Sequence, residues 1–204
     1  MTLSARLWSD NSGLAAEVLA HPFVGGIGDG SLPRELFADY IAQDAFFLES
    51  FARAYALALS RSPDTATLLT LADLLTGVRE ELGLHASYAA SWGIDMAGVE
   101  PWPATLAYTE FLLATASTQD LGVIYAAMTP CMRLYAWLGA SLDASKAGPY
   151  AQWVQTYADP GFSDVAASLE RLLDDRADDT TLVRTAYRRA MQLELGFFEA
   201  AYAR

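Results

Sequence analysis

The spacing of the apolar residues limits the fold more than any other feature of the sequence. Apolar residues recur every three or four positions almost everywhere, and alternating runs rich in Val, Ile and Thr are scarce. This period predicts an all-α protein, because it places apolar side chains along one face of each helix. We expect a helical bundle of about seven to eight helices, with approximate bounds at 3–20, 33–60, 63–91, 103–116, 119–143, 147–158, 161–174 and 179–203.

Prolines and capping residues support these bounds. Leu32-Pro33 and Ser62-Pro63 place proline in the first turn of a helix, and Ser62 is of a type that caps a helix N-terminus. Asp159-Pro160 repeats the pattern, and the run Asp-Asp-Thr at 178–180 offers caps for the last helix. The linkers are short, so we expect residues 1–204 to form one domain.

The glycine-rich segment HPFVGGIGDGSLP, residues 21–33, is predicted to be a loop. Its glycines do not match a dinucleotide-binding loop, which needs a strand before it and a helix directly after the third glycine. Here a helix precedes the segment, and the next helix is expected only near Pro33. Asp29-Gly30 is more simply a tight turn with Gly30 at positive φ.

Composition excludes several classes of partner. Acidic residues number 25 against 13 basic ones, which gives a formal charge of −12. That balance argues against nucleic-acid binding and against an anionic membrane surface, both of which need Lys and Arg. No signal peptide or membrane span is visible. The single cysteine excludes an internal disulfide, so we expect a reducing, cytoplasmic location.

Two acidic residues interrupt the apolar stripes of their predicted helices. Asp44 lies in an aromatic stripe of the second helix and Glu194 in one of the last helix, whereas Glu199 fits a solvent-facing position. A carboxylate that points into a core is costly without hydrogen-bond partners. Each could cap a neighbouring helix or pair with an arginine such as Arg53 or Arg133. Two such acids together favour a polar pocket inside the bundle, where ligand sites often lie.

Cys131 follows a proline in the helix AAMTPCMRLYAWLG. Pro130 removes a backbone hydrogen bond and is expected to kink this helix. Tyr135 lies four residues after Cys131, so the thiol and the ring can share one face. A free cysteine in an apolar helix is often a small core residue. A reactive thiol instead needs a positive charge, a helix N-terminus or a base beside it, and spacing alone leaves both roles open.

Glu81 and His85 form an E-x3-H pair one helical turn apart. Such pairs supply ligands to di-iron sites in bundles, but a full site needs about four carboxylates and two histidines. The chain has two histidines, and His21 lies at the start of the predicted loop. We therefore expect no metal. Glu81 and His85 are predicted to bond to each other or to brace the pocket, with His85 titrating near neutral pH.

Aromatic residues are plentiful near these positions. Tyr108 lies in PATLAYTEFL, and Trp153 and Tyr157 lie in YAQWVQTYADPGF. Most such residues fill a core. Planar rings also offer stacking faces for a flat heteroaromatic ligand.

Four segments together resemble the thiaminase II (TenA) family. HPFVGGIGDGSLPRELFADYIAQDAFFLESFARAYA is similar to its N-terminal signature, and MTPCMRLYAWLG to its cysteine-bearing helix. YAQWVQTYADPGF is similar to the next aromatic block, and LELGFFEAAY to the C-terminal glutamate segment. The segments span nearly the whole chain in the family's order, and the first two combined are more specific than any single motif.

The resemblance implies a heme-oxygenase-like helical bundle that assembles as a homotetramer and needs no cofactor. It implies hydrolysis of small aminopyrimidines, or of thiamine, to release hydroxymethylpyrimidine. Cys131 matches the family nucleophile, Glu194 the acid/base, and Asp44 the carboxylate that holds the ring nitrogen and the amino group. The tyrosines that match pocket positions are Tyr108, Tyr135 and Tyr157.

Phe47 departs from the family pattern. Many members carry a tyrosine there, thought to help activate the cysteine, whereas a phenylalanine can stack but offers no hydroxyl. A pyrimidine-binding or regulatory protein with little turnover is therefore an alternative to the hydrolase. An oxidase on the same bundle, metal-dependent or cofactor-free, is a second alternative.

Overall fold

The structure, a computed structural model, describes residues 1–94 and 98–203. Within these ranges it contains ten α-helices, one short 3-10 helix and no strand, which confirms the all-α prediction. The helices are α1 (Leu3–Asp10), α2 (Ser12–Ala20), α3 (Pro22–Asp29), α4 (Arg34–Leu59), α5 (Thr65–Trp92), α6 (Pro103–Thr118), α7 (Leu121–Ser141), η1 (Gly148–Tyr150), α8 (Ala151–Ala158), α9 (Pro160–Arg176) and α10 (Thr181–Tyr202).

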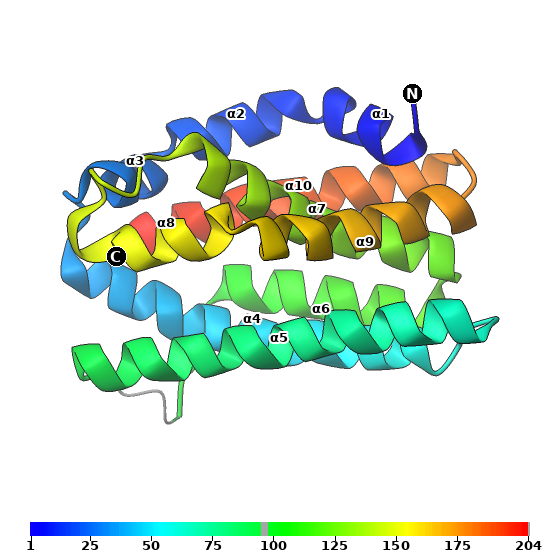
Figure 1. Cartoon of the computed structure of the whole chain (residues 1–204), viewed down its shortest axis with the longest axis horizontal. Helices are drawn as coiled ribbons and strands as arrows, with labels where there is room; N and C mark the ends of the chain where they lie inside the picture. The colour runs from blue at the N-terminus through cyan, green and yellow to red at the C-terminus, as the bar shows by residue number, and fades with distance from the viewer. Residues whose placement is uncertain (95–97, 204) are drawn as a thin grey trace.

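The helices form two groups that lie one above the other (Figure 1). In the lower group, α4 packs against α5 and α6. In the upper group, α7 packs against α8, α9 and α10, while α1 and α2 cover the top of the bundle. Contacts of α10 with α6 and α4 join the two groups. Side chains from α4, α7 and α10 can therefore meet in the interior.

The expected number of helices was too low because of the N-terminal region. The predicted helix 3–20 is divided at Asn11, which ends α1 with φ −113° and ψ 11° and whose side-chain amide bonds to the Leu7 carbonyl. Apolar periodicity continues through such a break, so the sequence pattern does not reveal it.

The predicted loop at residues 21–33 was also partly wrong, because α3 occupies most of it. Pro22 starts α3, and the ring of His21 accepts a hydrogen bond from the Phe23 N–H. Phe23 and Ile27 are buried on one face, and this burial outweighs the low helix propensity of the glycines. The turn after α3 is as predicted, with Gly30 at φ 78°.

Helix starts were predicted with mixed success. Asp159 and Thr180 cap α9 and α10 as expected. Pro33 precedes α4 instead of lying in its first turn. Ser62 does not cap α5, because the helix starts later and Asp64 accepts the Thr67 N–H at 2.8 Å.

The contact between α7 and α8 is unusually close at Gly139. A Cβ built at Gly139 would lie 2.3 Å from the carbonyl carbon of Tyr157, so no other residue fits without moving α8. This approach brings Tyr157 against Tyr135, with ring centroids 4.8 Å apart.

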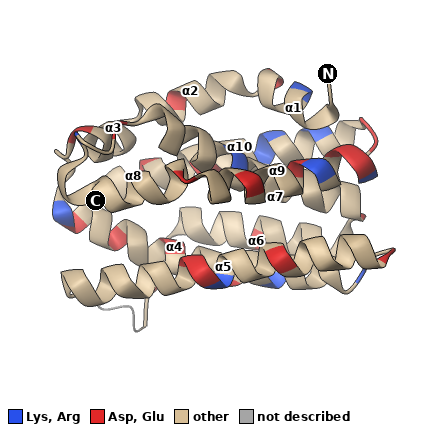
Figure 2. Ribbon diagram, viewed as in Figure 1, with Lys and Arg blue, Asp and Glu red and all other residues tan. Residues whose placement is uncertain are grey.

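Acidic residues are distributed over helices of both groups (Figure 2). Within the part of the chain that the structure describes, no helix has the length and apolarity needed to cross a membrane.

Candidate functional site

Asp44 points from α4 into the bundle and pairs with a histidine. Only 4% of the residue is exposed, and its Oδ2 lies 2.7 Å from Nε2 of His85 on α5. The predicted arginine partners are absent from this pair, since Arg53 bonds to Glu49 and Arg133 to Glu170. Asp44 therefore forms a buried ion pair between two neighbouring helices.

Both ring nitrogens of His85 face acceptors. Nδ1 lies 2.9 Å from the carbonyl oxygen of Glu81, which cannot donate, and Nε2 faces the Asp44 carboxylate. Burial lowers the pKa of His85, but the bond and charge of Asp44 outweigh burial and raise the pKa to about 9. His85 is thus an imidazolium at neutral pH, and the prediction that it titrates near neutrality was wrong.

Glu81 braces the site through a different partner. His85 bonds to the backbone of Glu81, as predicted in part, but the Glu81 carboxylate accepts a hydrogen bond of 2.6 Å from the Tyr157 hydroxyl. Burial and the charge of Asp44 raise the pKa of Glu81 to about 7, against the opposing effects of His85 and Tyr157. Glu81 therefore links α5 to α8.

Glu194 points inward from α10, with 2% of the residue exposed. The Tyr108 hydroxyl on α6 donates to its Oε1 at 2.7 Å. Burial raises the pKa of Glu194 to about 8, although the bonds from Tyr108 and Cys131 lower it. Glu194 is accordingly a neutral acid at neutral pH and can supply a proton.

Cys131 lies inside α7, which continues as a helix through Pro130. Burial, followed by the charges of Glu194, Glu81 and Asp44, raises the pKa of the thiol well above its ordinary value. The thiol is therefore protonated at rest. Glu194 lies near enough to the thiol for each group to shift the pKa of the other, so its carboxyl can take the thiol proton once it has given up its own.

Aromatic rings surround these groups. The hydroxyls of Tyr135 and Tyr40 lie 3.1 Å apart, and the ring centroids of Phe47 and Tyr108 are 4.7 Å apart. The predicted site residues fall into a cluster around Asp44 and a cluster around Glu194, and the ring of Phe197 joins the two, with centroids 5.8 Å from Tyr40 and 6.3 Å from Phe47. Within this network lie Asp44, Phe47, Glu81, His85, Tyr108, Cys131, Tyr135, Tyr157 and Glu194.

Tyr40 was missed as a site residue. Its hydroxyl bonds to Tyr135 and accepts a bond of 3.4 Å from the Trp153 indole, so it positions two rings of the site. Its place one helical turn before Asp44 was a usable signal, because residues four apart share a helix face. Aromatic residues in a stripe are so common that this signal alone does not separate Tyr40 from core residues.

Metal ligation was considered for Glu81 and His85. Among the residues that the structure describes, no three His, Cys, Asp or Glu side chains are grouped so that they could hold a metal ion.

Solved structures define the fold class. A TenA family transcription regulator from Silicibacter sp. TM1040 superposes with a TM-score of 0.91 at 27% identity, covering 98% of this chain and 96% of that one. A heme oxygenase-like domain from Shewanella denitrificans gives 0.70 at 15% identity, covering 98% and 91%. The fold is therefore heme oxygenase-like, as predicted.

The family follows from the sequence. The model of the TENA/THI-4/PQQC family matches residues 8–204, and the chain belongs to this family. The aminopyrimidine aminohydrolase of Halalkalibacterium halodurans is 32% identical over 99% of this chain and 96% of that protein. The bifunctional TH2 protein of Arabidopsis thaliana is 35% identical over 97% of this chain, which spans only 37% of that protein's length.

Proposed function

We propose that this chain is an aminopyrimidine aminohydrolase that releases hydroxymethylpyrimidine by covalent catalysis at Cys131. Its substrates are the aminopyrimidine breakdown products of thiamine, or thiamine itself. The names of the relatives confirm the coarser prediction of an enzyme that hydrolyses C–N bonds. The finer part of the proposal is supported by the burial of Cys131 and Glu194 together, with the pKa of Glu194 raised so that it holds a proton near the thiol.

Asp44 orients the pyrimidine in this proposal. Its Oδ2 is held by His85, and among the described residues its hydrogen bonds involve that oxygen alone. The other oxygen is therefore available to the amino group of the substrate. A charged acceptor with a fixed partner gives both affinity and orientation.

Glu194 activates the ring. An aminopyrimidine is a poor electrophile until a ring nitrogen is protonated, and a carboxyl group with a pKa of about 8 still holds its proton at neutral pH. Tyr108 keeps the carboxyl in place through its bond to Oε1. Proton transfer to the ring leaves a carboxylate beside the thiol.

Cys131 then adds to a ring carbon, and Glu194 takes the thiol proton as the C–S bond forms. The adduct expels the amine from the exocyclic methylene, and the departing amine takes the proton from Glu194. Water adds to the methylene carbon and returns a proton to Glu194. Cleavage of the C–S bond releases a thiolate that takes the proton from Glu194, Glu194 then recovers the ring proton, and hydroxymethylpyrimidine is released.

Incubation with aminomethylpyrimidine and with thiamine tests the proposal. Mass spectrometry is expected to detect hydroxymethylpyrimidine and, after acid quench, an adduct on Cys131. Cys131→Ser is expected to abolish product release while its circular dichroism and Tm match those of the wild type. Full activity of this variant would overturn the nucleophile assignment.

Phe47 favours a second candidate function, that of a pyrimidine-binding or regulatory protein. The ring of Phe47 packs on Tyr108 and carries no hydroxyl for Cys131. The Silicibacter relative is named as a transcription regulator. Tight binding of aminopyrimidine without product over several hours would favour this alternative over the hydrolase.

We also propose the homotetramer, the single domain of residues 1–204 and the cytoplasmic location on the resemblance and the composition alone. Light scattering coupled to size-exclusion chromatography is expected to give a mass about four times that of the chain. A monomer would contradict the tetramer without touching the site.

A further inference from the structure

We propose that a groove between α5, α8 and α9 is the entrance to the site and binds the part of the substrate that the reaction displaces, when that part is a cation in the bound substrate. This inference rests on the proposed hydrolase function and adds to it the class of leaving group that the enzyme prefers. The groove has a volume of about 670 Å³. It lies outside the buried network but shares Glu81 with it.

An entrance is needed because the reacting groups are enclosed. Asp44 and Glu194 are almost fully buried, and Cys131 is 9% exposed. Residues of two helices, α5 and α7, belong both to the lining of the groove and to the surroundings of the reacting groups. The lining includes Met132, the residue after Cys131, and Glu81, which faces Asp44 and His85.

Tyr157 contacts residues of both the groove and the site. Tyr157 bonds to Glu81 at 2.6 Å, and its ring packs edge-on against Phe162, which lines the groove, with centroids 5.0 Å apart. On its other side the ring of Tyr157 packs against Tyr135. In the proposed entrance, Tyr157 is thus the side chain that turns away from Glu81 to admit the substrate.

The groove is acidic. Its described lining contains Glu80, Glu81 and Asp159 and no Lys or Arg, and the remaining lining is largely apolar. Asp159 caps α9 and accepts the Gly161 N–H at 2.7 Å, which fixes its carboxylate at the rim. Carboxylates above an aromatic and apolar floor suit a flat organic cation, since charge attraction and ring contact then act together.

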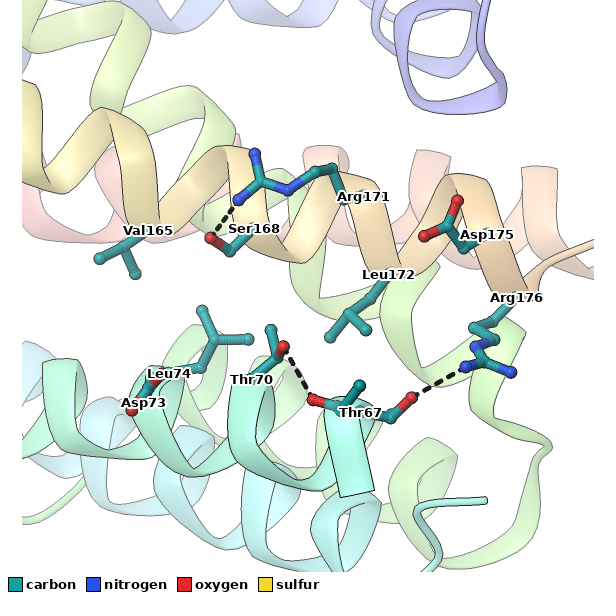
Figure 3. A pocket seen from close by; sticks show the side chains of 11 residues that line it. Thr67, Thr70, Asp73, Leu74, Val165, Ser168, Arg171, Leu172, Asp175 and Arg176 are labelled. Carbon is teal, nitrogen blue, oxygen red and sulfur yellow. Dashed lines mark hydrogen bonds between the residues drawn. The ribbon is translucent and has the colours of Figure 1, made fainter. Parts of the chain in front are cut away.

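A neighbouring hollow lacks the acidic surplus of the groove, because its lining holds two acidic residues, Asp73 and Asp175, and two arginines. It has a volume of about 280 Å³, lies between α5 and α9, and shares Leu74 and Val165 with the groove (Figure 3). Arg171 and Arg176 line it and bond to Ser168 and Thr67 (Figure 3). Of the two depressions between α5 and α9, the groove that borders the site is thus the one whose lining carries a net negative charge.

Two variants test the groove without touching the catalytic residues. Val165→Trp narrows it, and Glu80→Lys reverses a charge at an exposed position. The matched controls are Ser163→Trp on the same helix and Glu110→Lys on α6, both at exposed positions outside the groove lining. Each protein is assayed with thiamine, in which the group to be displaced is a heteroaromatic cation that leaves as a neutral thiazole, and with aminomethylpyrimidine, whose leaving group is ammonia.

Val165→Trp is expected to lower kcat/KM for thiamine about tenfold or more, because a misfit of one group in a pocket has effects of this size. Glu80→Lys is expected to lower it about threefold, as for a partly screened charge. Both variants should leave aminomethylpyrimidine within about twofold of wild type, and both controls should leave both substrates unchanged.

Equal losses on the two substrates, or no loss on thiamine, would overturn the groove assignment. If Val165→Trp misfolds, Glu80→Lys gives the answer alone. A wild-type protein that hydrolyses neither substrate would overturn the proposed function itself, whereas activity without groove-dependent selectivity would overturn only this inference.

Discussion

The Asp44 side and the Glu194 side of the site contain the same functional group in two different states. Both carboxylates are buried and aromatic rings surround both. Asp44 meets an imidazolium, whereas Glu194 meets a phenol and a thiol, which are neutral. Burial alone therefore does not set protonation, because a charged partner favours the ionised form and a neutral partner leaves the acid protonated. Carboxyl groups thus supply the site with both an orienting anion, at Asp44, and a proton donor, at Glu194.

The largest effect is expected at the neutral acid. Glu194→Gln should lower kcat about 10³-fold, since removal of a general acid costs about 10²–10⁴ in rate. Folding should change little, because a neutral amide replaces a neutral acid. The free energy of unfolding of the wild type should fall relative to Glu194→Gln as the pH rises from 4.5 through about 8, since the raised pKa favours the folded state only while the acid is protonated.

Product formation measured by mass spectrometry gives the rate, and denaturant titration at several pH values gives the stability. Retention of full activity in Glu194→Gln, or the absence of a relative slope between these pH values, would contradict a protonated Glu194.

Asp44→Asn should lower activity less than Glu194→Gln does and stability more. We expect kcat/KM to fall about 10²-fold through lost orientation, and the free energy of unfolding to fall by about 3 kcal/mol, because a buried imidazolium is left unpaired. Calorimetric Tm values compare the two variants directly. Equal destabilisation by Asp44→Asn and Glu194→Gln would contradict the distinction between the two sides.

His85→Gln tests the charge on the Asp44 side and keeps a possible donor. Activity should fall about tenfold, since a neutral donor bonds a carboxylate less strongly than an imidazolium does. The pKa of His85 lies above its ordinary value, so its stabilisation is complete below pH 6.5 and is lost as the pH rises through about 9. The stability difference between wild type and variant should shrink across that window.

A matched control for His85→Gln is Gln43→Leu, which removes buried hydrogen bonds to Thr105 and the Glu100 carbonyl but not a charge. It should destabilise the protein equally at pH 6 and pH 9. A pH-independent difference for His85→Gln as well would contradict the imidazolium.

The smallest effect is expected for Tyr108→Phe on the Glu194 side. The hydroxyl lowers the pKa of Glu194, so its removal should move the loss of activity at high pH to still higher pH, with a rate change of only about threefold. The pH profile of kcat/KM from pH 6 to pH 10 measures this shift. A move of the basic limb toward lower pH would contradict the assigned bond.

Much of the site could be predicted because polar residues in apolar stripes are rare and visible. Asp44 and Glu194 were found in this way, and the family resemblance added Cys131 and the tyrosines. The partners could not be predicted. Asp44 and His85 are 41 residues apart, and their contact depends on how far α4 and α5 slide along each other. A helical period gives the face of a residue but not this offset.

For the fold as well, the spacing of apolar residues predicted some elements and not others. The long helices followed from apolar spacing, whereas α3 was missed because four of the eight residues at 22–29 are glycine or proline. The buried face of α3 depends on contacts with α10, which is distant in the sequence, and with α2, which precedes the segment. Local propensity therefore failed where tertiary packing supplies the stability.

The absence of a side chain at position 139 limits which residues this position can hold. Gly139 carries no side chain and contacts no reacting group, yet any larger residue pushes the α8 backbone away at Tyr157. Tyr157 can lie this close to α7, the helix of Cys131, because residue 139 has only a hydrogen atom in place of a side chain. A methyl group at this position would therefore displace Tyr157 without itself contacting the site, so we expect only glycine to be tolerated there.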